Sequence, residues 1–215
     1  MVLNASYKGI WKVAYPIIIG SLAQNLIGLT DIVFLGRVGE VELGASGLVS
    51  IYYIVLVMIG FGISRGGQIL IARRAGQKKY DEIGSVIHNL LYIEMLVAGI
   101  LFLFLAFLSP IILKFFINYN DIYEASLAYL NYRVYSIPFS FFSFVIMALY
   151  IGIGRTRVIA TITTILFLVN ICFNYSLIFG KFGLPEMGIA GAGLASTIAE
   201  VVSTFAGLIY ILNDK

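Results

Sequence analysis

The chain has 215 residues, of which 60% are hydrophobic and only 12% charged, with a mean hydropathy of +0.99 and a formal net charge of +3. A soluble domain must cover its surface with polar side chains, so this composition excludes a soluble globular protein. The apolar runs are continuous instead of short and alternating, which argues against a β-barrel. Composition therefore predicts an all-α, polytopic membrane protein.

Six apolar runs are long enough to cross about 30 Å of hydrocarbon as helices that rise about 1.5 Å per residue. We expect the six spans at about 11–36, 44–72, 84–108, 125–153, 157–180 and 188–212. Short segments rich in glycine, asparagine or charge separate them, as at 36–40 and 154–157. Because these connections are short, neighbouring helices are expected to pack antiparallel, with no soluble domain between them.

The first predicted span contains a carboxylate, Asp31. An acid at the centre of a bilayer costs about 2.5–3.5 kcal/mol, so an intramembrane carboxylate is by default a candidate ion or proton site. Gly20, Gln24 and Gly28 precede Asp31 at helical spacing and share one face with it, and Asn25 flanks this face. The pattern predicts a surface that meets protein or a water-filled cavity.

Spans two and three contain ionisable residues to which the sequence assigns no role. Arg65 can pair with a carboxylate or extend to the interface, and the adjacent Gly66 and Gly67 predict a closely packed or locally broken helix. His88 stands near a helix start, where a histidine more often reaches the interface than binds a ligand. Glu94 lies near the middle of span three, and both a proton relay and a solvated cleft are open interpretations.

Span four combines aromatic residues with a proline. Tyrosines near the predicted span ends are typical of the aromatic belt at a membrane interface. Tyr135, Phe139 and Phe142 instead surround Pro138 within the span. Aromatic rings attract organic cations, so Tyr135 is a candidate residue of a substrate cavity.

Spans five and six each contain polar residues four positions apart, which lie on one helix face. These are Asn170 and Asn174 in span five, and Ser196 and Glu200 in span six. Together with Asp31, three helices contribute carboxylate, amide and hydroxyl oxygens. Hard cations such as Na⁺ take oxygen ligands, and a carboxylate removed from water also binds a proton. The alternative is a hydrogen-bond network that only joins helices, at about 0.6 kcal/mol per bond.

The candidate coupling-ion residues are therefore Asp31, Asn170, Asn174 and Ser196, of which the first three are potential Na⁺ ligands. Supporting or substrate-cavity candidates are Gln24, Asn25, Tyr135 and Glu200.

Lysine and arginine are unevenly distributed between the two sides of the predicted bundle. One side carries Lys8, Lys12, Arg73, Arg74, Lys78, Lys79, Arg155, Arg157 and Lys215, and the other carries Arg37, Lys114, Arg133 and Lys181. Cytoplasmic loops are enriched in these residues, so we expect a multi-pass protein of the cytoplasmic (inner) membrane with both termini on the cytoplasmic side.

Five segments follow one another in an order that resembles a known family. They are Asp31 with the glycines of 36–39, the run 67–76 that leaves span two, 152–157, 170–180, and the glycine-rich run 183–192. In these positions the chain resembles the MATE family, the multidrug and toxic-compound extrusion transporters, over almost its whole length.

The resemblance implies a twelve-helix antiporter of two six-helix lobes, in which Na⁺ or H⁺ enters as a small amphipathic, often cationic compound leaves. Alternating access would be a rocking of one lobe against the other. Asp31 would match the coupling-ion aspartate of the N-terminal lobe, assisted by Asn170, Asn174 and Ser196. Some members have aspartate where this chain has Asn174, which leaves Asp31 as the main local carboxylate.

Residues 1–215 are accordingly expected to form only the N-terminal lobe, with the second lobe absent and no activity in isolation. The expected partners are the lipid bilayer, the substrate and the C-terminal lobe of the same transporter. No cofactor beyond the coupling ion and no nucleic-acid partner is expected.

Three other functions are alternatives to the antiporter. A lipid-linked-sugar flippase shares the architecture but would be expected to line its cavity with more cations than Arg65 and Arg133. A non-transporting membrane scaffold is a further alternative. A membrane enzyme is not expected, because the sequence shows no His/Cys cluster, nucleophile–base pair or phosphate-binding glycine loop.

Overall fold

The structure is a computed structural model that describes residues 7–213, apart from the side chains at positions 8, 9, 12 and 13. Three of the lysines counted in the orientation prediction, Lys8, Lys12 and Lys215, thus have side chains outside the described part of the chain.

Six helical spans make up the described residues, and each is long and apolar enough to cross a membrane. They are α1 (Tyr7–Leu35), α2 (Glu40–Gly76), α3 (Tyr80–Leu103) with η1 (Phe104–Leu108) and α4 (Ser109–Phe116), α5 (Asn120–Arg133) with η2 (Val134–Ser136) and α6 (Ile137–Gly152), α7 (Thr156–Phe179), and α8 (Gly188–Asn213). The predicted all-α fold of six spans is confirmed.

The third span differs most from its predicted bounds, because it continues to Phe116 instead of ending near residue 108. The turn η1 is a π-helix, in which the backbone widens by one residue, and Pro110 follows at the start of α4. Proline is tolerated at the first turn of a helix, where its missing N–H removes no hydrogen bond. The chain therefore stays helical through Pro110, which makes the third span longer than predicted.

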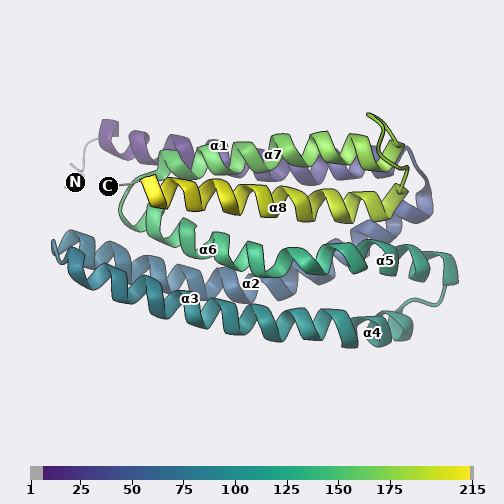
Figure 1. Cartoon of the computed structure of the whole chain (residues 1–215), viewed down its shortest axis with the longest axis horizontal. Helices are drawn as coiled ribbons and strands as arrows, with labels where there is room; N and C mark the ends of the chain where they lie inside the picture. Colours follow the sequence, from purple (N-terminus) through teal and green to yellow (C-terminus); the bar gives the residue numbers. More distant parts are fainter. Residues whose placement is uncertain (1–6, 214–215) are drawn as a thin grey trace.

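The spans form two groups that pack against each other (Figure 1). In the first group, α7 packs against both α1 and α8. In the second group, α2 packs against α3, α5 and α6. Contacts of α5 and α6 with α8 join the groups, and the two ends of the chain lie at the same end of the bundle.

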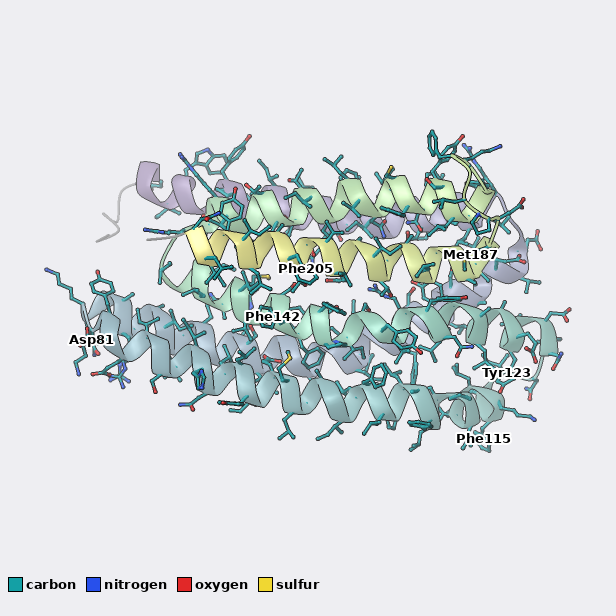
Figure 2. All side chains as sticks on the ribbon, viewed as in Figure 1. Asp81, Phe115, Tyr123, Phe142, Met187 and Phe205 are labelled. Carbon is teal, nitrogen blue, oxygen red and sulfur yellow. The ribbon has the colours of Figure 1, made fainter. Side chains whose placement is uncertain are left out.

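Large apolar side chains cover the outside of the bundle. Phe115 on α4 is 81% exposed and lies at the outer edge of the bundle (Figure 2), and Phe205 on α8 is also exposed. A soluble monomer does not expose apolar surface over so many of its elements. Lipid acyl chains are the solvent that suits this surface.

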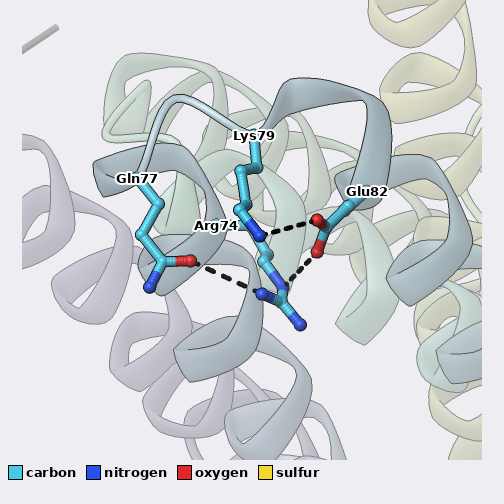
Figure 3. Close-up of polar contacts among 4 residues, drawn as sticks. All are labelled: Arg74, Gln77, Lys79 and Glu82. Carbon is cyan, nitrogen blue, oxygen red and sulfur yellow. Dashed lines mark hydrogen bonds and ion pairs between the residues drawn. The ribbon is translucent and has the colours of Figure 1, made fainter.

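Ion pairs and a hydrogen bond join residues on either side of the turn between α2 and α3, at one end of the bundle (Figure 3). The Glu82 carboxylate pairs with Arg74 Nε at 2.9 Å and with Lys79 Nζ at 3.0 Å, while Arg74 donates a long 3.4 Å hydrogen bond to Gln77. All of these groups are partly or fully open to solvent. Exposed ion pairs contribute little, about 0–1 kcal/mol, and salt screens them.

The substitution Glu82→Gln is therefore expected to lower the melting temperature only slightly at low salt. The loss should shrink in high salt, because the ion pairs that it removes are already screened there. Melting temperatures at low and high ionic strength measure both effects. The matched control is Glu124→Gln, since Glu124 is an exposed glutamate outside the ion pairs of the described residues; an equal loss in both variants would contradict the role of the pairs.

Candidate functional site

Asn174 on α7 links the residues predicted as a coupling-ion site. Its side-chain Nδ2 donates to Asp31 Oδ1 on α1 at 2.5 Å and to Asn170 Oδ1, one turn earlier on α7, at 2.9 Å. Asn170 Nδ2 in turn donates to Ser196 Oγ on α8 at 3.3 Å. The structure thus brings Asp31, Asn174, Asn170 and Ser196 into one chain of hydrogen bonds across three helices.

Two features of this network favour binding of a cation. Asn170 and Asn174 are almost fully buried, whereas Asp31 is only half-buried and remains accessible. The Asn174 Oδ1 atom is buried and accepts no hydrogen bond from the described residues. A buried acceptor without a partner costs about 1–3 kcal/mol, so the site has one unsatisfied oxygen close to a carboxylate.

The position of Asp31 follows from how α1 packs on α7. Near the middle of α1, a Cβ atom on Gly20 would lie only 3.0 Å from Thr163 Oγ1, so the glycine permits close approach. Near its end, the ring of Phe34 packs edge-on against the ring of Phe179, with centroids 5.8 Å apart. These two contacts hold α1 along α7 and direct Asp31 toward the two asparagines.

Gln24 and Glu200 lie in a different place, a small cavity between α1, α6, α7 and α8. Its volume is about 60 Å³, enough for several water molecules. Its polar lining includes Gln24, Glu200, Ser140 and Ser203, and Ser140 interacts with the Glu200 carboxylate. Apolar side chains, among them Phe144 and Leu166, make up most of the rest of the cavity wall.

The remaining supporting candidates lie outside both places. Asn25 is exposed and donates to the carbonyl of Ser21 on its own helix at 2.9 Å. Tyr135 is also exposed, and its ring lies 5.8 Å from that of Phe102. Gly28 meets open space, since no atom lies within 4 Å of where its Cβ would be. Of the predicted face of α1, then, Gly20 and Asp31 meet α7, Gln24 lines the cavity, and Gly28 is open.

Arg133 is predicted both as a cation of one side of the bundle and as a possible cavity cation, but its surroundings come only from the structure. The structure places it in the last turn of α5, within the fourth span. Its guanidinium carbon lies 4.6 Å from the centroid of the Tyr53 ring, and its charge acts on both Asp31 and Glu200. The signal was present, since a charge inside an apolar span calls for the same scrutiny as Asp31. Without Arg133, the predicted difference in lysine and arginine between the two sides of the bundle becomes larger.

The residues without an assigned role also take definite positions. Arg65 is exposed, donates to Gln68 Oε1 at 2.7 Å and lies over the Phe61 ring, and α2 continues unbroken past it. Gly67 is closely packed, and the continuous helix excludes the alternative of a local break. His88 is exposed with its ring edge-on to Tyr92. Glu94 is 0% exposed, which rules out the solvated cleft.

The donor set at Asp31 suits a monovalent hard cation or a proton. Among residues 7–213, no group of three or more His, Cys, Asp or Glu side chains gathers as a metal site. The oxygens near Asp31 belong to neutral amides and a hydroxyl instead. One carboxylate with neutral oxygens provides a single negative charge, on which Arg133 also acts, so the site suits at most a monovalent cation or a proton.

Comparison with known proteins gives a consistent family. The MatE family model matches residues 16–176, well over half of the chain. The multidrug resistance protein NorM of Vibrio cholerae is 25% identical over 213 residues, which cover 95% of this chain and 44% of that protein. A probable multidrug resistance protein NorM of Idiomarina loihiensis is 28% identical over 212 residues, covering 99% and 46%.

The fold is shared with solved transporters. A structure described as the outward-facing conformation of a multidrug resistance MATE family transporter of the MOP superfamily superposes with a TM-score of 0.87 at 18% identity, over 95% of this chain and 45% of that one. The chain spans about half the length of the curated relatives that it matches. The extent of the family match shows that the chain, with its six membrane-length spans, belongs to the MatE family.

Proposed function

We propose that the chain forms the N-terminal lobe of a cation-coupled antiporter for small amphipathic, cationic compounds, and that Asp31 binds the coupling ion. The observation that carries this proposal is the buried, unpaired Asn174 Oδ1 beside the Asp31 carboxylate. The residues that would hold Na⁺ are Asp31, Asn174 and Asn170, with Ser196 in support. A proton would instead be held by the Asp31 carboxylate alone.

The hydrogen bond between Asn174 and Asp31 suggests how ion binding acts on the lobe. A cation at Asp31 competes with the Asn174 N–H for the same carboxylate oxygen. The competition weakens a link between α1 and α7, and α1 is the least buried of the six spans. Ion occupancy is therefore expected to shift the packing of α1, as a population shift toward the conformation that binds the ion better.

A second six-helix lobe would supply the opposite wall of the substrate cavity. This part of the proposal rests on relatives of about twice the length and on the resemblance to two-lobe transporters. The shared end of the bundle at which both chain ends lie would face the cytoplasm, as the lysine and arginine bias indicates. Vesicles that contain only this chain are expected to show no gradient-driven efflux of a fluorescent organic cation; robust efflux would overturn the two-lobe requirement.

The coupling-ion part is tested by the cation dependence of stability. A ligand that binds only the folded state raises the free energy of unfolding by RT ln(1 + [L]/Kd). The melting temperature of the chain in lipid nanodiscs should rise when NaCl replaces choline chloride if Na⁺ is the ion. If a proton is the ion, the melting temperature should instead depend on pH, and this dependence should require Asp31. No response to either ion would contradict the proposal.

The substitution Asn174→Asp is expected to tighten Na⁺ binding by about tenfold or more, because it adds a second negative charge beside the ion. In the absence of Na⁺ the same variant should melt at a lower temperature, since two carboxylates then repel each other. Na⁺ titration of the melting temperature measures both effects. The control is Asn120→Asp, which adds the same charge at the exposed start of α5; equal tightening in both variants would mean that total charge, and not the site, attracts the ion.

A further inference from the structure

Glu94 is an acid enclosed in the apolar core of the second helix group. Its side chain is 0% exposed, and neither carboxyl oxygen has a hydrogen-bond partner among the described residues. It shares the buried face of α3 with Leu90 and Ala98. Leu90 belongs to one apolar cluster and Ala98 to another, so the carboxyl group lies where the two clusters adjoin.

The neighbours of Glu94 follow from the packing register of α2, α3 and α6. A Cβ on Gly67 would lie 2.5 Å from Leu90 Cδ2, which fixes the level at which antiparallel α2 and α3 meet. One turn further along α3, Glu94 reaches the level of Ser64 on α2. Ser64 Oγ donates to the carbonyl of Phe144 on α6 at 2.7 Å. Glu94 therefore lies at the junction of these three helices, with the Ser64 hydroxyl at its level.

Among the described residues, no charged group pairs with the acid and no donor reaches its carboxyl oxygens. On α2, Arg65 is exposed and engaged with Gln68. On α3, His88 is exposed, and on α6 Tyr150 lies more than a turn beyond the level of Phe144. The turn η1, which also packs on α3, contains no titratable residue.

We propose that Glu94 is a second proton-binding site of the lobe, at the junction of α2, α3 and α6 and separate from the Asp31 network on α1, α7 and α8. An ionised carboxylate that is fully buried, with no donor or counter-charge from the described residues, is strongly unfavourable, so the enclosed group carries a proton. A single carboxyl lacks the several oxygen ligands that a metal cation needs. Release of the proton to water leaves a carboxylate that needs hydration, so it is linked to opening of this junction.

Infrared spectroscopy of the chain in nanodiscs tests this site, because a protonated carboxyl group has a carbonyl stretch that a carboxylate lacks. Variants Asp31→Asn and Glu200→Gln remove the other intramembrane acids, so a band that persists in their combination at neutral pH is assigned to Glu94. In that combined background we expect the band to be lost when Glu94→Gln is added and to be retained when Ser64→Ala is added, which leaves the acid in place. Absence of the band from the combination, or its survival after Glu94→Gln is added, would overturn the proposal.

A second measurement covers the case in which Glu94→Gln does not fold. Glutamate labelled with ¹³C shifts the carbonyl band of every protonated glutamate and leaves aspartate bands in place. In the Glu200→Gln background, a shifted band at neutral pH supports the assignment, and an unshifted spectrum contradicts it. The readout requires no Na⁺ and no transport, so its failure leaves the proposed role of Asp31 untouched.

Discussion

Replacement of Asp31 by asparagine is expected to abolish the cation dependence of the melting temperature, with a loss of affinity of about 100-fold or more. Asp31 provides the only carboxylate in the hydrogen-bonded network with Asn174, and about 2.7 kcal/mol of lost charge attraction corresponds to that factor. The variant should still fold, because an asparagine oxygen can accept the hydrogen bond that Asn174 donates. Titration of the melting temperature with NaCl, and with pH, measures the loss.

The control for this variant is Asp81→Asn. Asp81 is an exposed aspartate at the start of α3, at the end of the bundle and far from the network (Figure 2). Both variants change the net charge equally, so only a site-specific effect separates them. If Asp31→Asn kept the full response to Na⁺ and to pH, the ion site would have to lie elsewhere in the protein.

The second large effect is expected in the close contact between α7 and α8. A Cβ on Gly191 would lie 2.7 Å from the backbone carbonyl atoms of Leu177, which cannot move aside as a flexible side chain can. Gly191→Ala should therefore force the helices apart and lower the free energy of unfolding by about 1–3 kcal/mol. Separation of α7 from α8 also stretches the bond from Asn170 to Ser196, so the response to the coupling ion should weaken as well.

Gly28→Ala is the matched control for this substitution. A Cβ at Gly28 meets no atom within 4 Å, and alanine favours a helix over glycine by about 0.5–1 kcal/mol. This variant should melt at the same or a slightly higher temperature. Denaturant titration in the same lipid measures the free energy of unfolding of both variants. Equal stability of the two would show that α7 and α8 have room to adjust.

Much of the fold could be predicted because it depends on local properties of the chain. The number of spans and their helical character follow from the length of each apolar run and from the requirement that backbone groups be hydrogen-bonded within lipid. The cost of Asp31 in an apolar span likewise needs no structure to be recognised. Helical spacing correctly placed Asn170 and Asn174 on one face, since that face depends only on the helical repeat.

The surroundings of Arg133 and Glu94 could not be predicted from local sequence patterns. Arg133 stacks on Tyr53 in the same region as Asp31, and this contact is not predictable because Tyr53 and Arg133 come from different helices. The full enclosure of Glu94 depends on α2 and α6 covering one face of α3. The extension of the third span through η1 depends on a widened turn that hydropathy does not reveal.

The sequence by itself therefore determined a six-span membrane protein with an acid, two amides and a hydroxyl as candidate ion ligands. Only the tertiary structure decided that Asn174 lies between Asp31 and Asn170 with one oxygen unsatisfied, and that Gln24 and Glu200 line a separate cavity. The physical reason is that the helical repeat fixes which residues share a face, whereas side-chain packing between helices fixes which faces meet.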